Sequence, residues 1–187
     1  MYLPLILEKH WLWVCGDPAG SFADLRGADL TGVDLTDARL CDANLTGANL
    51  CYANLTGANL TEASLTGANL TGANLTGANL TGANLTDAGL RGATLTDAIL
   101  NGADLIGTDV CDTCLIDAGV RSDGYRFVGH MVHGVLMICA GCRYFTVSEA
   151  VEHWTSTRGG TPLGGESIAQ VRLIEAVAKS RGYTGAW

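Results

Sequence analysis

Residues 66–85 read Thr-Gly-Ala-Asn-Leu four times in succession without a change. The same spacing continues in looser form on both sides, so that an apolar residue stands at every fifth position from Leu25 to Leu115, nineteen positions in all. All of these residues are leucine except Val110. Alanine stands two residues before each of them, with three exceptions: Val33, Thr108 and Thr113. The remaining segments lie before or after this ladder, so the ladder decides the fold.

A period of five fits neither an α-helix nor a flat strand. On a helix each step of five turns the side chain by about 140°, so the leucines would form no buried face. On a strand the side chains alternate with a period of two, so successive leucines would point to opposite faces. The remaining solution is a chain that bends once per repeat at the Thr-Gly pair, because glycine tolerates the backbone angles of tight turns. Alanine and leucine then point inward, and the Asn or Asp between them points outward.

The tandem pattern Ala-(Asn/Asp)-Leu-x-x, over residues 22–118, resembles the pentapeptide-repeat family. The resemblance implies a mainly β fold, a right-handed quadrilateral parallel β-helix with four repeats per coil. Outward side chains would then form columns at intervals of twenty residues, and we expect stacked Asn and Thr side chains to meet their copies above and below. The resemblance implies little about function, because a fold does not define an activity.

Composition limits the class of protein. Of the 187 residues, 48% are hydrophobic and 16% are charged, which predicts one or two folded domains. No apolar run approaches the roughly 20 residues that a membrane span requires. The start of the chain lacks the basic region and cleavage site of a signal peptide, so we expect a soluble, intracellular protein. Seven cysteines without a scaffold spacing favour reduced thiols over disulfides.

The net charge of −8 is unevenly distributed. Residues 22–118 carry twelve acids and three bases, a net charge of −9, whereas residues 119–187 carry five acids and seven bases, a net charge of +2. The acids of the ladder lie toward its two ends, and Glu62 is the only charged residue from position 43 to position 86. The middle of the ladder is therefore nearly neutral.

Residues 1–21 are predicted to form an N-terminal cap. The open end of a coil exposes unpaired backbone groups and apolar side chains, so another element has to cover it. The alternation of Trp11, Trp13 and Cys15 predicts a short strand laid on the first coil. We favour this covering role for the two tryptophans over a binding role.

Residues 119–187 are predicted to form a small α+β module. The segment from Tyr125 onward has two apolar runs with a break at His133-Gly134, which is typical of a β-hairpin. Thr146 and Glu149 have the spacing of a capping box, which predicts a helix to about Trp154. The glycine-rich residues 159–165 predict a flexible link, and a last helix is expected over residues 166–181.

Part of this module resembles a C-terminal module of phage-encoded pentapeptide-repeat proteins. The resemblance is carried by Ser122-Asp-Gly-Tyr125 and by Ala140-Gly-Cys-Arg-Tyr-Phe-Thr-Val-Ser-Glu-Ala-Val-Glu-His-Trp154. It implies a viral protein, present in the virion or in the host cytoplasm. Because interface energy concentrates in aromatic and arginine residues, we expect a protein partner to contact Arg126, Arg143 and Tyr144. The sequence does not decide whether the chain forms homo-oligomers, since the coil ends and the hairpin could both serve as contact surfaces.

The cysteines raise the question of a metal site. Two Cys-x-x-Cys pairs, Cys111/Cys114 and Cys139/Cys142, flank His130 and His133, and four thiolates at such spacing can hold zinc. Register argues against this site, because Cys111 and Cys114 fall in outward positions of the last coil whereas Cys139 lies in a strand. The two histidines, three residues apart on a strand, point to opposite faces. We predict no metal and no cofactor, and leave open whether the four cysteines converge.

The sequence favours a non-enzymatic protein. No nucleophile and base have the spacing of a catalytic pair, and the Gly-Gly pairs lack the lysine of a phosphate-binding loop. We predict a structural or protein–protein interaction protein, with phage capsid or tail subunits as partners and no direct contact with nucleic acid or membrane. The alternative is an acidic DNA mimic that binds a type II topoisomerase, as some members of the family do. Such mimicry needs negative charge spaced like that of duplex DNA, about one per 1.7 Å, which the neutral middle of the ladder does not supply.

Overall fold

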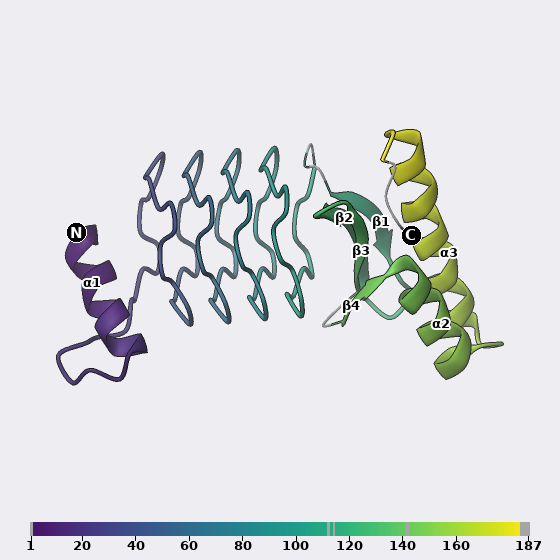
Figure 1. The fold of residues 1–187 in the computed structure, drawn as a ribbon, viewed down its shortest axis with the longest axis horizontal. Coiled ribbons are helices and arrows are strands. Elements are labelled where there is room, and N and C mark those ends of the chain that lie inside the picture. Colours follow the sequence, from purple (N-terminus) through teal and green to yellow (C-terminus); the bar gives the residue numbers. More distant parts are fainter. Residues whose placement is uncertain (1, 112, 114, 141–142, 184–187) are drawn as a thin grey trace.

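The computed structural model describes residues 2–111, 113, 115–140 and 143–183. The described residues from 23 to 115 form successive coils, here called the coil stack, which lies between an N-terminal helix and a C-terminal module (Figure 1). No helix in the described ranges combines the length and hydropathy that a membrane span requires. The helices and strands are, in order, α1 (Leu3–Val14), β1 (Ile116–Val120), β2 (Arg126–Val132), β3 (Val135–Ala140), β4 (Arg143–Thr146), α2 (Val147–Arg158) and α3 (Pro162–Ser180).

Four repeats make one coil. Each outward residue forms a parallel backbone bridge with the residue twenty positions later, beginning with Asp24 and Asn44 and continuing to Gly89 and Asp109. The bend falls at the Thr-Gly pair, and Gly67 has a φ of +63°, in the left-handed region that glycine adopts without a steric penalty. The predicted bend of the chain once every five residues is therefore confirmed.

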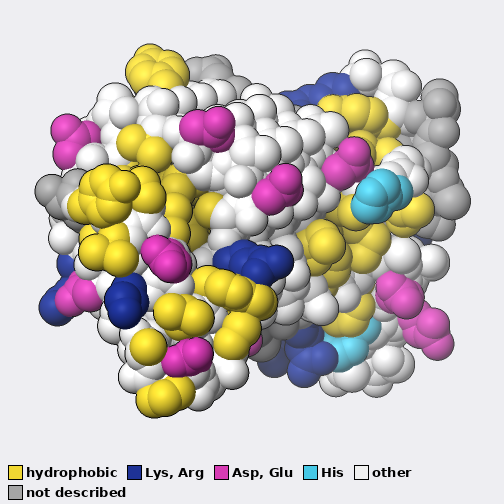
Figure 2. Space-filling model, turned by 60° about the vertical axis from the view of Figure 1, so that its left-hand side comes forward, with side chains coloured by type: hydrophobic (Ala, Val, Ile, Leu, Met, Phe, Trp, Pro, Cys, Tyr) yellow, Lys and Arg dark blue, Asp and Glu magenta, His cyan; other side chains and the backbone are white. Residues whose placement is uncertain are grey.

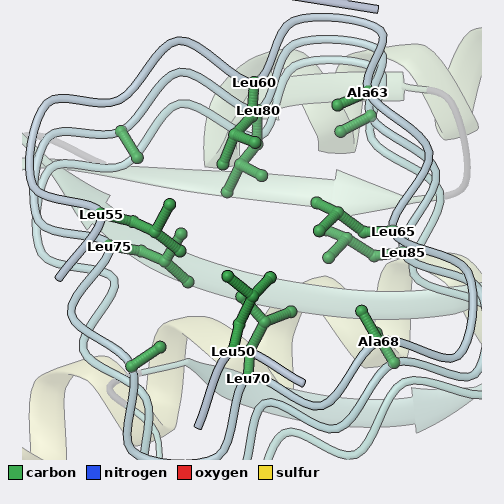
Figure 3. Close-up of a cluster of buried hydrophobic side chains, with 14 of the residues drawn as sticks. Leu50, Leu55, Leu60, Ala63, Leu65, Ala68, Leu70, Leu75, Leu80 and Leu85 are labelled. Atoms are coloured by element: carbon green, nitrogen blue, oxygen red, sulfur yellow. The ribbon is translucent and has the colours of Figure 1, made fainter. Parts of the chain in front are cut away.

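The interior of the stack is built from leucine and alanine. Figure 3 shows leucines approaching from four sides, with Leu55 beside Leu75 on one side and Leu60 beside Leu80 on another. Leu75 and Leu80 are both 0% exposed, which confirms the inward register. Burying a leucine completely contributes about 1.5–3 kcal/mol, so the column of leucines supplies most of the stability of this part of the chain.

The outward Asn side chains bond within their own repeat. Oδ1 of Asn74 accepts hydrogen bonds from the backbone N–H (3.1 Å) and the hydroxyl (2.6 Å) of Thr76. Asn69 bonds to Thr71 in the same way. The expected columns are present, since Asn54 and Asn74 are bridged neighbours, but Oδ1 of each bonds to the threonine two residues onward, which supplies two donors at short range. Near the first coil, Nδ2 of Asn54 does reach back one coil, to the Thr36 hydroxyl (2.8 Å).

The N-terminal cap is a helix and not the expected strand. Pro4 stands in the first turn of α1, where its missing N–H breaks no helical hydrogen bond. The residues that meet the first coil recur at helical spacing, three or four apart: Leu3, Ile6, Leu7 and His10. The two tryptophans that suggested a strand are partly exposed. The Arg39 guanidinium carbon lies over the Trp11 ring, 3.6 Å from the ring centroid. The alternation at positions 11, 13 and 15 was therefore misleading.

A histidine fastens α1 to the stack. The His10 side chain is fully buried, and Nδ1 accepts a hydrogen bond from the Ala23 N–H (3.1 Å). Nε2 donates to the Cys41 carbonyl (2.8 Å), so the ring is neutral. Desolvation lowers the pKa of His10, against smaller raising effects of the Cys41 carbonyl and of Asp42.

The module contains one antiparallel sheet of strand order β1-β2-β3-β4. The expected hairpin is present as β2 and β3, joined at His133 and Gly134, which have φ values of +47° and +80°. Strands β1 and β4 extend it on either side, although the sequence pattern did not reveal them. The predicted boundary between residues 118 and 119 falls inside β1, and the division into domains stays a prediction.

The two faces of the sheet serve different cores. Val128 and Cys139, paired across β2 and β3, join the core of the coil stack. Phe127 and Ile138, one residue away in each strand, pack with α2 and α3 on the other face. Because strand side chains alternate between faces, the sheet covers the last coil with one face and holds the helices with the other, as Figure 1 shows.

The two C-terminal helices differ from expectation at their ends. The capping box of Thr146 and Glu149 is present, and α2 runs four residues past the expected end, to Arg158. Helix α3 begins at Pro162, so residues 162–165, expected in a flexible link, are helical. The reason is local, because the Thr161 hydroxyl caps the helix by accepting from the Gly164 N–H (3.1 Å) and proline suits the first turn.

Candidate functional site

Two of the three residues expected to contact a partner are engaged inside the molecule. Arg126 donates one guanidinium N–H to the Thr108 carbonyl of the last coil, and it holds the Asp117 carboxylate through Nε (3.2 Å) and Nη2 (2.6 Å). The Tyr144 hydroxyl lies 2.8 Å from His130 Nε2, and burial raises the pKa of Tyr144. Their visible role is to join the sheet to the coil stack, and their assignment to a partner stays a prediction.

Arg143, the third residue, has an exposed side chain on the opposite face of β4 from Tyr144. It lines a hollow of about 330 Å³ between the sheet and α2, here called the basic cavity. This volume lies at the lower end of the range typical of ligand pockets, about 300–1,000 Å³. The cavity is lined by Arg121, Tyr125, Phe127, Ala140, Arg143, His153, Trp154, Thr157 and Arg158.

Helix α2 supplies one wall of the basic cavity through a single face. Positions 153, 154, 157 and 158 are neighbours on a helix because they are separated by one turn. Aromatic contacts hold this face in place, since the His153 and Phe145 rings stack at 5.1 Å and Trp154 lies 5.1 Å from Phe127. This wall is therefore packed against the sheet through its aromatic rings, and it ends in a basic residue, Arg158.

The arginines of the basic cavity are of two kinds. Arg121 is 6% exposed, and its guanidinium is committed to the Asp123 carboxylate and to the Ser167 hydroxyl (2.8 Å). The guanidinium groups of Arg143 and Arg158 are exposed and form no hydrogen bond or ion pair with any described residue. The pKa of His153 is lowered, first by desolvation and then by the charges of these two arginines. The hollow thus carries two unneutralised positive charges.

A second hollow, of about 600 Å³, lies between α2 and α3. Val147 and Val151 contribute apolar walls, and Glu175 is paired with Arg172 (2.7 Å). This groove is larger and more open than the basic cavity. Glu152, the third charged residue of its lining, forms no ion pair with a described residue, so this groove carries negative charge where the basic cavity carries positive charge.

The cysteine hypothesis can be followed for two of its four residues. Cys114 and Cys142 lie outside the described residues. Cys139 is buried, with its Sγ 3.7 Å from the Leu100 carbonyl and 3.9 Å from that of Ala103, whereas Cys111 is exposed. Over the described part of the chain, no three His, Cys, Asp or Glu side chains are close enough to share a metal ion.

Sequence reasoning found Arg143 but missed the residues opposite it on α2. The signal was present, because His153, Trp154, Thr157 and Arg158 recur at helical spacing once the helix is extended past Trp154. Ending the helix too early hid this face. Tyr125 lies beside this face of α2 because of how the strands pair, and no local sequence pattern predicts that pairing.

The outer surface of the coil stack offers little chemical variety. In Figure 2 it is mostly white, with isolated acidic side chains, while hydrophobic side chains gather at the end formed by α1. The exposed apolar residues there include Leu5, Trp13 and Phe22. The polar groups of the coils are largely used in their own turns, as described for Asn69 and Asn74.

A family model and several solved structures are similar to parts of this chain. Residues 21–52, 43–82 and 78–115 match the model of the family described as pentapeptide repeats, with eight copies. Among solved structures, a pentapeptide repeat protein from the Arabidopsis thaliana thylakoid lumen is 36% identical, and the match covers 53% of this chain and 68% of that one with a TM-score of 0.48. No curated protein matches the chain.

Two further structures are similar over shorter or more divergent stretches. The pentapeptide repeat protein Rfr23 from the cyanobacterium Cyanothece 51142 is 44% identical over 43% of this chain and 63% of its own length, with a TM-score of 0.32. QnrB1, a plasmid-mediated fluoroquinolone resistance protein, is 20% identical over 50% of this chain and 65% of its own, with a TM-score of 0.29. The family match spans residues 21–115, more than half of the chain. With its twenty-residue bridge register and its leucine interior, this chain belongs to the pentapeptide repeat family.

Proposed function

We propose that the chain is a non-enzymatic protein–protein interaction protein in which the coil stack is a rigid spacer and the C-terminal module recognises the partner. For the spacer we propose the right-handed quadrilateral β-helix of the family. Pentapeptide repeat proteins mediate protein–protein interactions, and this general role needs no catalytic group. The proposal adds where on this chain the recognition takes place.

One observation carries this placement. In the central coils the Oδ1 atoms of Asn69 and Asn74 are used in their own turns, whereas the guanidinium groups of Arg143 and Arg158 on the module have no partner among the described residues. Interface energy concentrates in arginine and aromatic residues in well-formed pockets. A surface of identical Thr-Gly-Asn units has neither, so it suits a spacer.

We further propose that the chain is phage-encoded and that its partners are capsid or tail subunits. The support is the resemblance of residues 122–125 and 140–154 to the phage-type module. The test is mass spectrometry of particles of the encoding phage, purified on a density gradient. We expect the chain in intact particles at a constant ratio to the major subunit, and its absence from them would contradict the virion role.

The spacer role has its own test in the same particles. Asn69→Ala and Asn74→Ala should each leave incorporation unchanged, because each removes only turn hydrogen bonds worth about 0.5–1.5 kcal/mol apiece. If either substitution alone abolished incorporation, the recognition surface would lie on the central coils and not on the module.

The alternative function is binding to a type II topoisomerase as an acidic DNA mimic. The net charge of −9 on residues 22–118 supports it, and the neutral stretch from residue 43 to residue 86, broken only by Glu62, speaks against it. A supercoiling assay with DNA gyrase and the purified full chain separates the two. We expect unchanged supercoiling, and inhibition at micromolar concentration would favour the DNA mimic.

A further inference from the structure

We propose that the basic cavity binds an acidic peptide segment of the partner, with a carboxylate held by Arg143 and Arg158 and a neighbouring aromatic side chain on the cavity wall. This inference rests on the proposed function, since it names the chemistry of the partner that the module recognises. Three features of the cavity point to such a ligand: free donors, no competing acid among the described residues of its lining, and a wall that a small ion would leave unused.

The free donors belong to Arg143 at the start of β4 and Arg158 at the end of α2. Both line the same cavity, and neither guanidinium forms a hydrogen bond or an ion pair with any described residue. A guanidinium presents five N–H donors in a planar fork that matches a carboxylate bidentately. Two such forks at one hollow are therefore prepared for an anionic group.

The acids of the module do not compete for these donors. Asp123 holds Arg121, and Glu175 pairs with Arg172 and Lys179. Glu149 closes the capping box of α2, and Glu166 accepts from the Ser122 N–H (2.9 Å). The fifth acid, Glu152, is exposed and lines the groove between α2 and α3. None of these five acids lines the basic cavity, so no described acid of the module neutralises its positive charge.

The remaining lining selects a peptide over a free ion. The accessible aromatic surface comes from Tyr125, which is 43% exposed, and from the half-buried His153, whereas Phe127 and Trp154 are buried and form the floor behind them. A phosphate ion would meet the arginines and leave this surface in water. An acidic side chain with an aromatic neighbour fills both parts of a cavity of about 330 Å³ and buries apolar area as well.

The test is a titration of the full-length protein, followed by the arginine side-chain and tryptophan indole signals in nuclear magnetic resonance. The probe is the peptide Glu-Asp-Phe-Asp-Glu, blocked at both ends. Its counterparts are the peptide with Gln and Asn in place of the acids, and inorganic phosphate alone. We expect the acidic peptide to bind, the neutral peptide to bind at least about tenfold more weakly, and phosphate to bind more weakly than the acidic peptide.

The variants locate the binding. Arg143→Gln and Arg158→Gln should each lower the affinity for the acidic peptide about tenfold. Both should leave the thermal transition unchanged, because the two side chains are exposed and form no hydrogen bond with a described residue. Arg26→Gln is the matched control, since it removes the same charge from the coil stack, and it should leave the affinity unchanged.

Several outcomes would overturn the proposal. Equal weakening by all three variants would indicate attraction by net charge alone. Phosphate binding that depends on Arg143 and Arg158, without peptide binding, would make the cavity a free-anion site. Failure here is distinct from failure of the proposed function, because particles can contain the chain whether or not this peptide binds the cavity.

Discussion

Tyr52 and Glu62 occupy the turn position where most repeats have glycine. Their φ values are both +57°, in the region that L-residues with a Cβ avoid. Their side chains lie over the glycine one coil onward, so that a Cβ at Gly72 would stand 2.5 Å from the Tyr52 ring, and one at Gly82 would stand 2.3 Å from the Glu62 carboxylate. Glycine in this column therefore serves two purposes, because it accepts the turn and makes room for the larger side chain of the preceding coil.

Replacing two glycines of equal backbone geometry separates these purposes. Gly72 and Gly77 both have a φ of +67°, but nothing lies within 4 Å of a Cβ at Gly77. Gly77→Ala should cost about 1–2 kcal/mol from backbone strain alone, and Gly72→Ala should cost more. In a Tyr52→Gly background the cost of Gly72→Ala should fall to that of Gly77→Ala, as a double-mutant cycle in denaturant measures. Identical costs in the presence of Tyr52 would show that its ring moves aside freely.

The inward register is tested by placing one charge on neighbouring residues. Leu75→Asp puts an unpaired carboxylate into the dry interior, which costs several kcal/mol and is comparable with the whole free energy of unfolding. We expect it to abolish the cooperative thermal transition. Asn74→Asp adds the same charge at an exposed outward position and should shift the transition only slightly. A variant at position 75 that melted like the wild type would contradict the register.

Among the elements, the sheet has two roles: one face covers the last coil, and the other face forms one side of the basic cavity. Val128, Cys139 and Tyr144 face the last coil, and Phe127 and Ile138 face the helices. Deleting residues 119–187 would therefore do more than remove a recognition surface, because it would uncover the end of the stack. Point variants of the full chain are the sounder test of recognition.

Arg126→Gln tests how firmly the sheet is fastened. It removes the ion pair with Asp117 and the hydrogen bond to the Thr108 carbonyl. Because hydrogen bonds to charged groups contribute about 1.5–3 kcal/mol, we expect the module to loosen by about 2 kcal/mol, with faster amide hydrogen exchange in β2 and at the last coil. Arg26→Gln breaks an exposed pair with Asp24 and should cost under about 1 kcal/mol. Equal losses of stability from the two substitutions would show that Arg126 does not hold the sheet to the last coil.

At the scale of the whole molecule, a buried neutral histidine stands at each end of the coil stack. His10 joins α1 to the first coil, and His130 lies beneath the sheet beside Tyr144. Desolvation lowers the pKa of His130 to about 4, although the nearby Asp97 acts in the opposite direction, and Nδ1 has no hydrogen-bond partner among the described residues. Both ends therefore depend on a ring that is uncharged.

This arrangement predicts destabilisation by mild acid. Between the ordinary histidine pKa of 6.5 and the folded value of about 4, the unfolded chain binds a proton at His130 that the folded chain does not. The free energy of unfolding should therefore fall as the pH decreases through this window, by up to about 3 kcal/mol from His130. Urea unfolding at a series of pH values measures it.

The matched variants assign the effect. His130→Gln should remove the His130 share of the pH dependence between 4 and 6.5, and His133→Gln, at an exposed histidine of the same hairpin, is the matched control. His10 lies at the other end of the stack and should retain its own contribution in both variants. A wild-type stability that stayed constant over this range would contradict the neutral, buried state of His130.

The coil stack could be predicted from the order of residues alone. A strict repeat of five excludes a single helix or strand, and each repeat makes the same bend, so local chemistry settles the inward leucines and the Thr-Gly turns. The capping box at Thr146 and the hairpin break at His133 were readable for the same reason, since each depends on residues within a few positions of one another.

The elements that cover the two ends and the position of the basic cavity depend on long-range packing, which the repeat pattern does not record. Residues 1–21 carry both strand-like alternation and helical spacing, and docking of Leu3, Ile6 and His10 on the first coil selects the helix. Whether Arg126, Arg143 and Tyr144 can contact a partner depends on which face of the sheet each side chain occupies. Strand pairing turns Arg126 and Tyr144 toward the last coil and leaves Arg143 at the cavity beside Arg158. Such contacts join residues far apart in the chain, and no local pattern encodes them.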